Sequence, residues 1–355
     1  MNKLIVKLIS AYSSILLMLS FGTSASAQVQ KIVLKNDHVQ AEITPDVGGR
    51  LLSIGLAGKP NFLRVGEPII GNPNPRVNAD AENIGYLGHE IWVGPQSEWW
   101  VHQNINQKRA AEKAVWPPDP YLILAKNKVL ERSRKKVTLL SSASPISGVE
   151  LLKTYSLVKN KKNSLQLSVN AKNSRTENIA WDIWFNTRVY PDTQVYVPVA
   201  DAKDIQVKNL EDETYGSIEY SLNKGIFTLE TQPAPSIDFV KQKPARKGKI
   251  MIQPSQGWMA GFRDDQVFIV QFDHQEKSKI HPEQGQIELY TEYFFNDPSN
   301  GLLEMEVHAP YKTLGAGETM TAKEIWTVLE YNGDKSRDAQ IEFLRNNAKR
   351  LGLLF

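Results

Sequence analysis

Cysteine is absent from this 355-residue chain. Its absence excludes a thiolate nucleophile, Cys-ligated zinc or iron–sulfur sites, c-type haem attachment and a lipidated N-terminal cysteine. The other residue classes occur in globular proportions, with 41% hydrophobic and 23% charged residues. A single domain of this length buries about 75% of the surface that it exposes when unfolded, so its stability requires neither a disulfide nor a metal ion.

Hydrophobic runs long enough to span a membrane are missing after residue 27. The N-terminal segment has two early lysines, a mostly apolar stretch over 8–21, and the small-residue sequence Ala25-Ser26-Ala27. This pattern is typical of a secretory signal peptide, whereas the alternative, a membrane anchor, needs an apolar run of roughly 20 residues. We therefore expect a signal peptide over 1–27 that is cleaved near Ala27/Gln28, and a mature protein in the periplasm or outside the cell, without integral membrane association.

A strong net charge of either sign is also lacking. The formal charge is +3, and it falls to +1 without residues 1–27, which hold two lysines and no acidic residue. A near-neutral surface disfavours a nucleic-acid partner. Basic runs at 132–136, 159–162 and 241–249 contain no interleaved aromatic residues. We interpret them as solvated loops, with contact to an anionic polysaccharide as the alternative.

Alternation of apolar and polar residues with a period of two dominates from about residue 29 to 330. Such alternation predicts β-strands, and short polar links between the segments suit hairpins. The sequence therefore predicts an all-β fold of antiparallel sheets. The segments with the clearest strand pattern are 137–140, 149–158, 164–169, 226–229, 267–272 and 287–293.

A helical pattern is present only near the C-terminus, where Asp334 or Ser336 is placed to cap a helix. Apolar residues recur there at helical spacing, so we expect a short helix that packs against the outside of the sheets. The residues of this apolar stripe are Ile341, Leu344, Ala348 and Leu351.

The stretch 65–119 is irregular and rich in Pro, Gly and Asn. Loops of this length in a compact domain usually have a function or contain short elements. Half of the eight tryptophans lie in it, namely Trp92, Trp99, Trp100 and Trp116. This concentration is the first indication of a binding site.

The segment 180–189 has two chemically different faces if it is a strand, because alternate side chains then point to opposite sides. One face is predominantly apolar and suits the core: Trp181, Ile183, Phe185, Thr187 and Val189. The other face carries an acid, an indole, an amide and a guanidinium: Asp182, Trp184, Asn186 and Arg188. A row of this kind is typical of a polar ligand cleft.

Two further segments show the same alternation. The first places Glu304, Glu306 and His308 on the face opposite three apolar residues, and the second places Glu288 and Glu292 opposite Ile287 and Leu289. Neighbouring like-charged carboxylates on one strand face require a reason, so we assign the first pair to the cleft together with Asp182 and Trp184. We expect Glu288 and Glu292 to face water on the solvated side of the sheet.

Several motifs resemble known proteins. Residues 43–54, with the sequence Ile-Thr-Pro-Asp-Val-Gly-Gly-Arg-Leu-Leu-Ser-Ile, resemble the opening hairpin of galactose-mutarotase-like proteins. Residues 302–306 and 314–319, followed by Trp326, resemble the closing hairpin of that superfamily. The segments 88–96, 116–119 and 257–262 are similar to an uncharacterised bacterial domain-of-unknown-function branch. This resemblance covers nearly all of 28–355 and implies one domain, a supersandwich of two large antiparallel sheets with a sugar-binding concave face.

The resemblance also implies a chemistry. In aldose 1-epimerases a Glu on the closing hairpin takes the proton of the anomeric hydroxyl and a His protonates the ring oxygen, without a cofactor. Glu304 matches the position of that base. The expected His is missing from the middle strand, which has Asp182, Trp184 and Asn186 instead. His89, Asp182 and His308 are the candidates for the acid, and His89 is expected to point into the cleft beside the Trp-rich stretch.

The expected site combines the candidate acids and bases with a guanidinium and with indole rings, which are groups that bind sugars. Arg50 follows two glycines and is placed either to grip a carboxylate or vicinal hydroxyls, or to form a salt bridge across the sandwich. Indoles stack on the C–H faces of pyranose rings. We therefore expect Glu304, Asp182 and His89 to be catalytic, and the substrate-binding residues to be Arg50, Trp92, Gln96, Trp116, Trp184, Asn186 and Glu306.

The sequence is compatible with three functions: an aldose epimerase, a non-catalytic carbohydrate-binding protein, and a polysaccharide lyase or glycoside hydrolase, which only the fold suggests. The expected ligand is a mono- or oligosaccharide. No cofactor is expected, and no His-x-His or His-Glu-x-x-His metal motif occurs. A calcium site built from carboxylates and carbonyl oxygens stays open.

Overall fold

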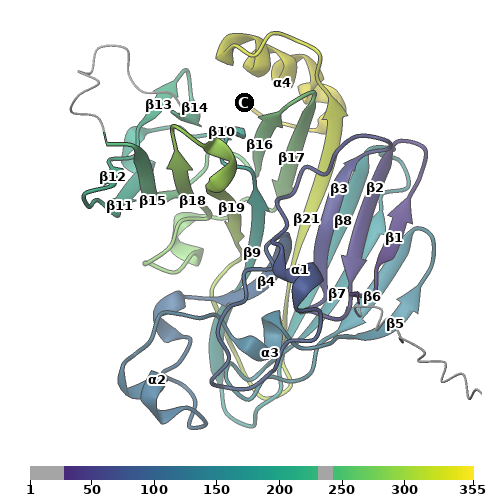
Figure 1. Ribbon diagram of the computed structural model, residues 1–355, viewed down its shortest axis with the longest axis vertical. Helices are drawn as coiled ribbons and strands as arrows, with labels where there is room; N and C mark the ends of the chain where they lie inside the picture. Colours follow the sequence, from purple (N-terminus) through teal and green to yellow (C-terminus); the bar gives the residue numbers. More distant parts are fainter. Residues whose placement is uncertain (1–27, 231–242) are drawn as a thin grey trace, which may run out of the picture.

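The computed structural model describes residues 28–230 and 243–355, so the predicted signal peptide lies outside the described residues. Two large β-sheets dominate the structure (Figure 1). Every strand pair is antiparallel except β12 with β15. The predicted all-β fold of two large antiparallel sheets is confirmed.

The first sheet has eleven strands and follows the order β1-β2-β3-β4-β9-β19-β18-β15-β11, with β12 paired to β15 and β20 paired to β9. Its central strands come from distant parts of the chain. The strands are β1 (Ile32–Lys35), β2 (Val39–Thr44), β3 (Arg50–Leu56), β4 (His89–Gly94), β9 (Ile179–Val189), β11 (Ile205–Asn209), β12 (Tyr215–Gly216), β15 (Ala245–Ile252), β18 (Ile287–Phe294), β19 (Leu302–His308) and β20 (Lys312–Leu314).

The second sheet has ten strands in the order β13-β14-β10-β16-β17-β21-β8-β7-β6-β5. All six strand segments expected from the alternation are strands here or in the first sheet. The strands are β5 (Lys128–Arg132), β6 (Lys136–Leu140), β7 (Val149–Leu157), β8 (Ser164–Asn173), β10 (Gln194–Pro198), β13 (Tyr220–Asn223), β14 (Ile226–Leu229), β16 (Trp258–Arg263), β17 (Gln266–Phe272) and β21 (Thr319–Glu330).

The main hydrophobic core is built from both sheets. The apolar faces predicted for β9 and β19 belong to it, because Ile183, Phe185, Met305 and Val307 are all at most 2% exposed. The pleat of a strand sends alternate side chains to opposite faces. The polar residues between these apolar ones therefore lie on the outer face of the first sheet.

Helices are few and mostly short. The C-terminal helix α4 begins after Ser336 and ends at Gly352, which has the left-handed conformation of a helix C-cap. Its buried residues Ile341, Leu344 and Leu351 pack on the outer side of the second sheet, as expected (Figure 1). No helix in the described ranges is long and apolar enough to cross a membrane. The helices are α1 (Pro68–Gly71), α2 (Gln107–Ala111), α3 (Pro120–Ile123) and α4 (Arg337–Leu351), with 3-10 turns at η1 (Gln96–Glu98), η2 (Ala202–Asp204), η3 (Lys277–Lys279) and η4 (Pro298–Asn300).

Candidate functional site

A cavity of about 690 Å³ is lined by outward-facing residues of the first sheet and by the segments around residues 83–87 and 96–116. A second cavity of about 290 Å³ adjoins it and shares Gln96, Val115, Trp184, Lys208 and Lys249. We call the two together the cleft. The polar and aromatic residues that line the larger cavity are Asn83, Trp92, Gln96, Trp116, Trp184, Arg188, Lys208, Lys249, Tyr290, Glu292, Glu304 and Glu306.

Strand register brings these residues together. The cross-strand partners of β9 on the outer face are Trp92 and His308 for Trp184, Glu90 and Glu306 for Asn186, and Glu304 for Arg188. Residues opposite each other on neighbouring strands lie about 5 Å apart. Three strands that are distant in the sequence, β4, β9 and β19, therefore form one continuous polar and aromatic surface.

Three tryptophans line the cleft and a fourth, Trp99, packs against them; we call the four the indole wall: Trp92, Trp99, Trp116 and Trp184. The ring centroids of Trp92 and Trp184 lie 4.9 Å apart, and those of Trp92 and Trp116 lie 6.1 Å apart. Trp99 is buried behind Trp184 and donates its indole N–H to the carbonyl of Val93. Trp116 is 49% exposed, so it is the indole of this wall that offers most of its surface to a ligand.

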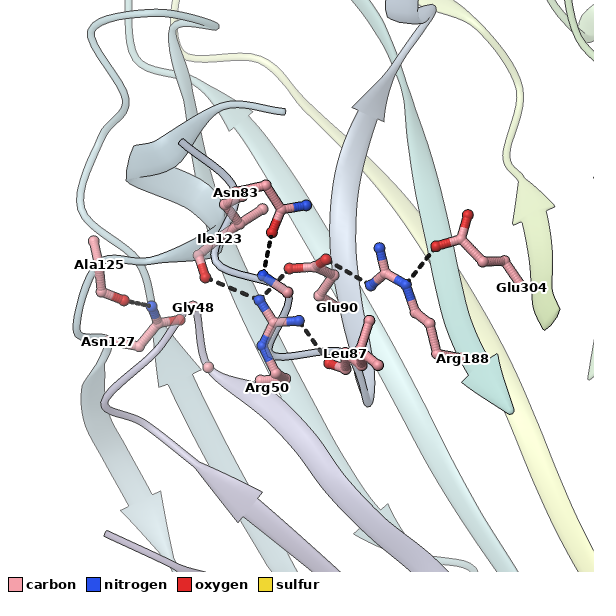
Figure 2. Close-up of polar contacts among 12 residues, drawn as sticks. Gly48, Arg50, Asn83, Leu87, Glu90, Ile123, Ala125, Asn127, Arg188 and Glu304 are labelled. Atoms are coloured by element: carbon pink, nitrogen blue, oxygen red, sulfur yellow. Dashed lines mark hydrogen bonds and ion pairs between the residues drawn. The ribbon is translucent and has the colours of Figure 1, made fainter. Parts of the chain in front are cut away.

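A chain of alternating charges runs from the cleft into the interior (Figure 2), and we call it the ion chain. Arg188 Nε donates to Glu304 Oε1 at 2.7 Å, and Arg188 Nη1 donates to Glu90 Oε1 at 2.5 Å. The second oxygen of Glu90 accepts from Arg50. Burial alone would lower the pKa of Arg188, but the two carboxylates outweigh it and raise that pKa. The ion chain thus fixes the Glu304 side chain at the cleft surface.

Arg50 lies at the interior end of the ion chain and does not line the cleft. Its guanidinium also donates to the carbonyls of Leu87 and Ile123 and is 1% exposed (Figure 2). Gly48 precedes it with φ +69°, and a Cβ there would lie 2.5 Å from the Ile123 carbonyl oxygen. The salt bridge weighed for Arg50 is present, but it joins neighbouring strands of one sheet and does not cross the sandwich. The expected grip on a ligand is not available to this side chain.

Lys249 forms a second charged group beneath the indole wall. Its ammonium lies 2.5 Å from Glu288 Oε2, 3.0 Å from Glu306 Oε2, and 4.6 Å from the Trp184 ring centroid. Burial would raise the pKa of Glu288, but Lys249 and His308 lower it. Burial raises the pKa of Glu306 well above its usual range, Lys249 opposes this shift, and Glu304 and Glu288 add to it. The pKa values of two neighbouring carboxyls of the cleft are therefore shifted in opposite directions, which is typical of acid and base pairs.

His308 and Asp182 lie together behind Trp184. Nδ1 of His308 is 3.2 Å from Asp182 Oδ2 and 2.8 Å from the Gln284 amide nitrogen. Burial would lower the pKa of His308, but Asp182 and Glu288 raise it to about 9. Asp182 also accepts from the backbone N–H of Gly94 and is fully buried. It lines neither cavity, so the structure gives it the position of a residue that orients His308.

His89, expected in the cleft, faces the other way. It lies on β4 next to Glu90, and the pleat turns it toward the second sheet. Its Nδ1 is 2.9 Å from Thr187 Oγ1 and its ring is 4.6 Å from that of Trp326. Burial lowers its pKa well below the usual value. The expectation that His89 points into the cleft is therefore wrong.

Within the described ranges one trio of side chains has ligand atoms close enough to hold a metal ion, namely Glu288, Glu306 and His308, with these atoms within 4.8 Å of one another. The Lys249 ammonium already contacts both carboxylates. A protonated His308 offers no lone pair to a metal. This donor set fits the internal ammonium of Lys249 better than a metal ion.

Two sequence interpretations are corrected here. Glu288 does not face water, since it is 2% exposed. The basic run that includes Lys249 is not a solvated loop over its described part, because 245–252 form the interior strand β15. The flanking residues indicate an interior strand in both cases. Lys249 directly precedes the apolar Ile250-Met251-Ile252, and Glu288 alternates with Ile287 and Leu289. Tyr290 and Lys208 also line the larger cavity, although the sequence did not predict them as site residues.

Comparison with known proteins agrees with this architecture. The family model of a domain of unknown function, DUF4380, matches residues 29–329. No curated protein matches the chain. A galactose mutarotase-like protein from Lactobacillus casei ATCC 334 is 10% identical, with a TM-score of 0.50 over 84% of this chain and 100% of that one.

Two other solved structures resemble this chain to a similar degree. The Slr1438 protein from Synechocystis sp. PCC 6803 is 12% identical, with a TM-score of 0.50 over 85% of this chain and 96% of that one. A TPR-domain containing protein from Parabacteroides distasonis ATCC 8503 is 15% identical, with a TM-score of 0.51 over 92% of this chain and 56% of that one. At these identities the likeness concerns the fold, which is galactose mutarotase-like.

Proposed function

Because the chain belongs to the DUF4380 family and has a galactose mutarotase-like fold, we propose that it binds a saccharide in the cleft. The observation that carries this proposal is the cavity of about 690 Å³ in which three indoles stand beside charged groups of both signs. Residues 1–27 have the pattern of a signal peptide. We therefore propose that binding takes place in the periplasm or outside the cell.

The lining suits the two-sided chemistry of a sugar ring. Its C–H faces pack on aromatic rings, and its hydroxyls need hydrogen-bond partners. Val115, Trp116 and Leu210 are among the few large hydrophobic residues that are about half exposed, and all three line the larger cavity. Exposed apolar residues that gather around a polar hollow support a ligand site. Gln96 and Glu304 supply polar atoms in the same cavity.

Replacing Trp116 with alanine is expected to weaken saccharide binding by about tenfold or more, since stacking and burial of one indole contribute about 1.5 kcal/mol or more. Stability should change little, because the side chain is 49% exposed. A glycan array followed by titration calorimetry with the saccharides that bind measures the effect. Phe355→Ala is the matched control, since Phe355 is 46% exposed but lies in the C-terminal segment on Trp258. Equal affinities for both variants and native protein would contradict the proposal.

A second candidate function, aldose epimerisation, is favoured by the two carboxyls of β19. Glu304 uses Oε1 to accept from Arg188 at 2.7 Å, and its side chain lines the larger cavity. Burial and the neighbouring carboxyls raise the pKa of Glu306 well above its ordinary value, which favours its protonated form. In this proposal Glu304 takes the proton of the anomeric hydroxyl while Glu306 gives a proton to the ring oxygen, which opens the ring. Rotation of the aldehyde and the reverse transfers close the ring as the other anomer and restore both groups.

Glu304→Gln and Glu306→Gln are each expected to lower the rate of anomer exchange by about 100-fold, a typical loss for one acid or base. Exchange of several aldoses and uronic acids would be followed by NMR, with the exposed Glu330→Gln as the control. If the native protein does not raise the rate of anomer exchange of any sugar above the rate in buffer, epimerisation is excluded. Saccharide binding would then stand as a non-catalytic function, tested separately by the Trp116 variant.

A further inference from the structure

Most charges that line the cleft have a partner of opposite sign within the protein. Arg188 pairs with Glu90 and Glu304, and Lys249 contacts Glu288 and Glu306. Glu292 contacts Lys247 at 3.3 Å and accepts from the hydroxyl of Tyr215. These groups are held by one another, so the protein's own residues already balance their charges.

Lys208 differs from them. It lines both cavities and is exposed, and within 28–230 and 243–355 it has no ion pair and no side-chain hydrogen bond. It also stands directly opposite Lys249 in the register of β11 and β15. Lys249 has its carboxylate partners, whereas Lys208 has no counter-charge among the described residues. An anion bound beside Lys208 would supply that counter-charge.

We propose that the cleft selects acidic saccharides and that Lys208 binds their carboxylate. This inference rests on the proposed saccharide binding and specifies its ligand class. A uronate is a sugar that has a carboxylate group attached to its ring. A lysine ammonium binds such a carboxylate through a charge-assisted hydrogen bond. The neutral rings pack on the indole wall, while the carboxylate lies beside Lys208.

The position of Lys208 also indicates the size of the ligand. It stands where the cavities of about 690 Å³ and 290 Å³ meet, together with Gln96 and Trp184. Binding pockets for compounds of several rings have about 300–1,000 Å³. A saccharide of two or more units fits this space, with one carboxylate at the junction of the two cavities.

The test compares saccharides that differ only in charge. Titration calorimetry of the full mature chain would use oligogalacturonates and oligoglucuronates, each as the free acid and as its methyl ester, at neutral pH and low salt. Native protein is expected to bind the acid about tenfold tighter than the ester, and the preference should shrink as salt is added. Lys208→Gln should lose the preference while its affinity for the ester stays unchanged. Lys203→Gln, which removes an exposed lysine outside the cleft lining, should keep it.

The outcomes separate this inference from the proposed function. Equal binding of acid and ester, or a preference that survives Lys208→Gln, overturns the role of Lys208 and leaves saccharide binding intact. Lys208 would then serve only as a charge that discourages pairing at the edge strand β11. Absence of binding by acid, ester and every neutral saccharide on the array overturns both proposals.

Discussion

Arg188→Met is expected to lower the free energy of unfolding by about 3–5 kcal/mol, the usual cost of removing one partner from a buried ion pair. Arg188 is 2% exposed and contacts two carboxylates and the Trp92 ring. Without its guanidinium, Glu90 keeps only Arg50 and Glu304 has no ion pair among the described residues. Equilibrium unfolding in urea measures the effect.

Arg263→Met is a matched control for this prediction. Arg263 also contacts two carboxylates, Asp192 and Asp264, and lies over an aromatic ring, that of Tyr190. Its partners are 46% and 57% exposed, however, and ion pairs in such surroundings contribute about 0–1 kcal/mol. Losses of equal size for the two variants would contradict the view that the ion chain owes its strength to burial. Loss of saccharide binding by Arg188→Met is expected in addition, because the ion chain positions Glu304.

Glu324→Gln is expected to stabilise the protein by about 4–5 kcal/mol at alkaline pH and to change stability little at acidic pH. Glu324 is fully buried, accepts from the indole N–H of Trp326 at 2.9 Å, and has its other oxygen unpartnered among the described residues. Burial raises its pKa from 4.5 to about 8. The folded protein therefore holds this proton more tightly than the unfolded chain, and stability is lost as the pH rises from about 4.5 through about 8. Glutamine is neutral at every pH and lacks this dependence.

Unfolding in urea between about pH 5 and pH 9 tests this prediction as the difference between variant and native protein. The difference matters because Lys153 titrates in the same range with the opposite sign: burial lowers its pKa to about 7, so it favours folding as the pH rises. Its contribution is common to both proteins and cancels. Glu330→Gln, on the same strand but exposed, should show a flat difference. A flat difference for Glu324→Gln as well would mean that Glu324 is ionised when folded.

Much of the fold and part of the site were predictable from local patterns. The alternation in 180–189 and 303–308 correctly separated core from outer residues, because it follows from the pleat of a single strand. It therefore identified Trp184, Glu304 and Glu306 as residues of the outer face. The same argument applied to 89–94 would have turned His89 toward the core with Ile91 and Val93. The face of the strand sets the direction of the His89 side chain, whereas its closeness in sequence to the tryptophans does not.

The amino-acid order by itself thus determined the strands, their two faces, the C-terminal helix and the residue types that meet in the cleft. Only the tertiary structure decided which of these residues are partners. Arg188 contacts Glu90 because β4 pairs with β9, and Lys249 contacts Glu288 and Glu306 because β15, β18 and β19 are neighbours. Strand faces depend on backbone geometry within a few residues, whereas strand neighbours depend on pairings between segments far apart in the chain. Burial, charge pairing and the resulting pKa shifts follow from those pairings.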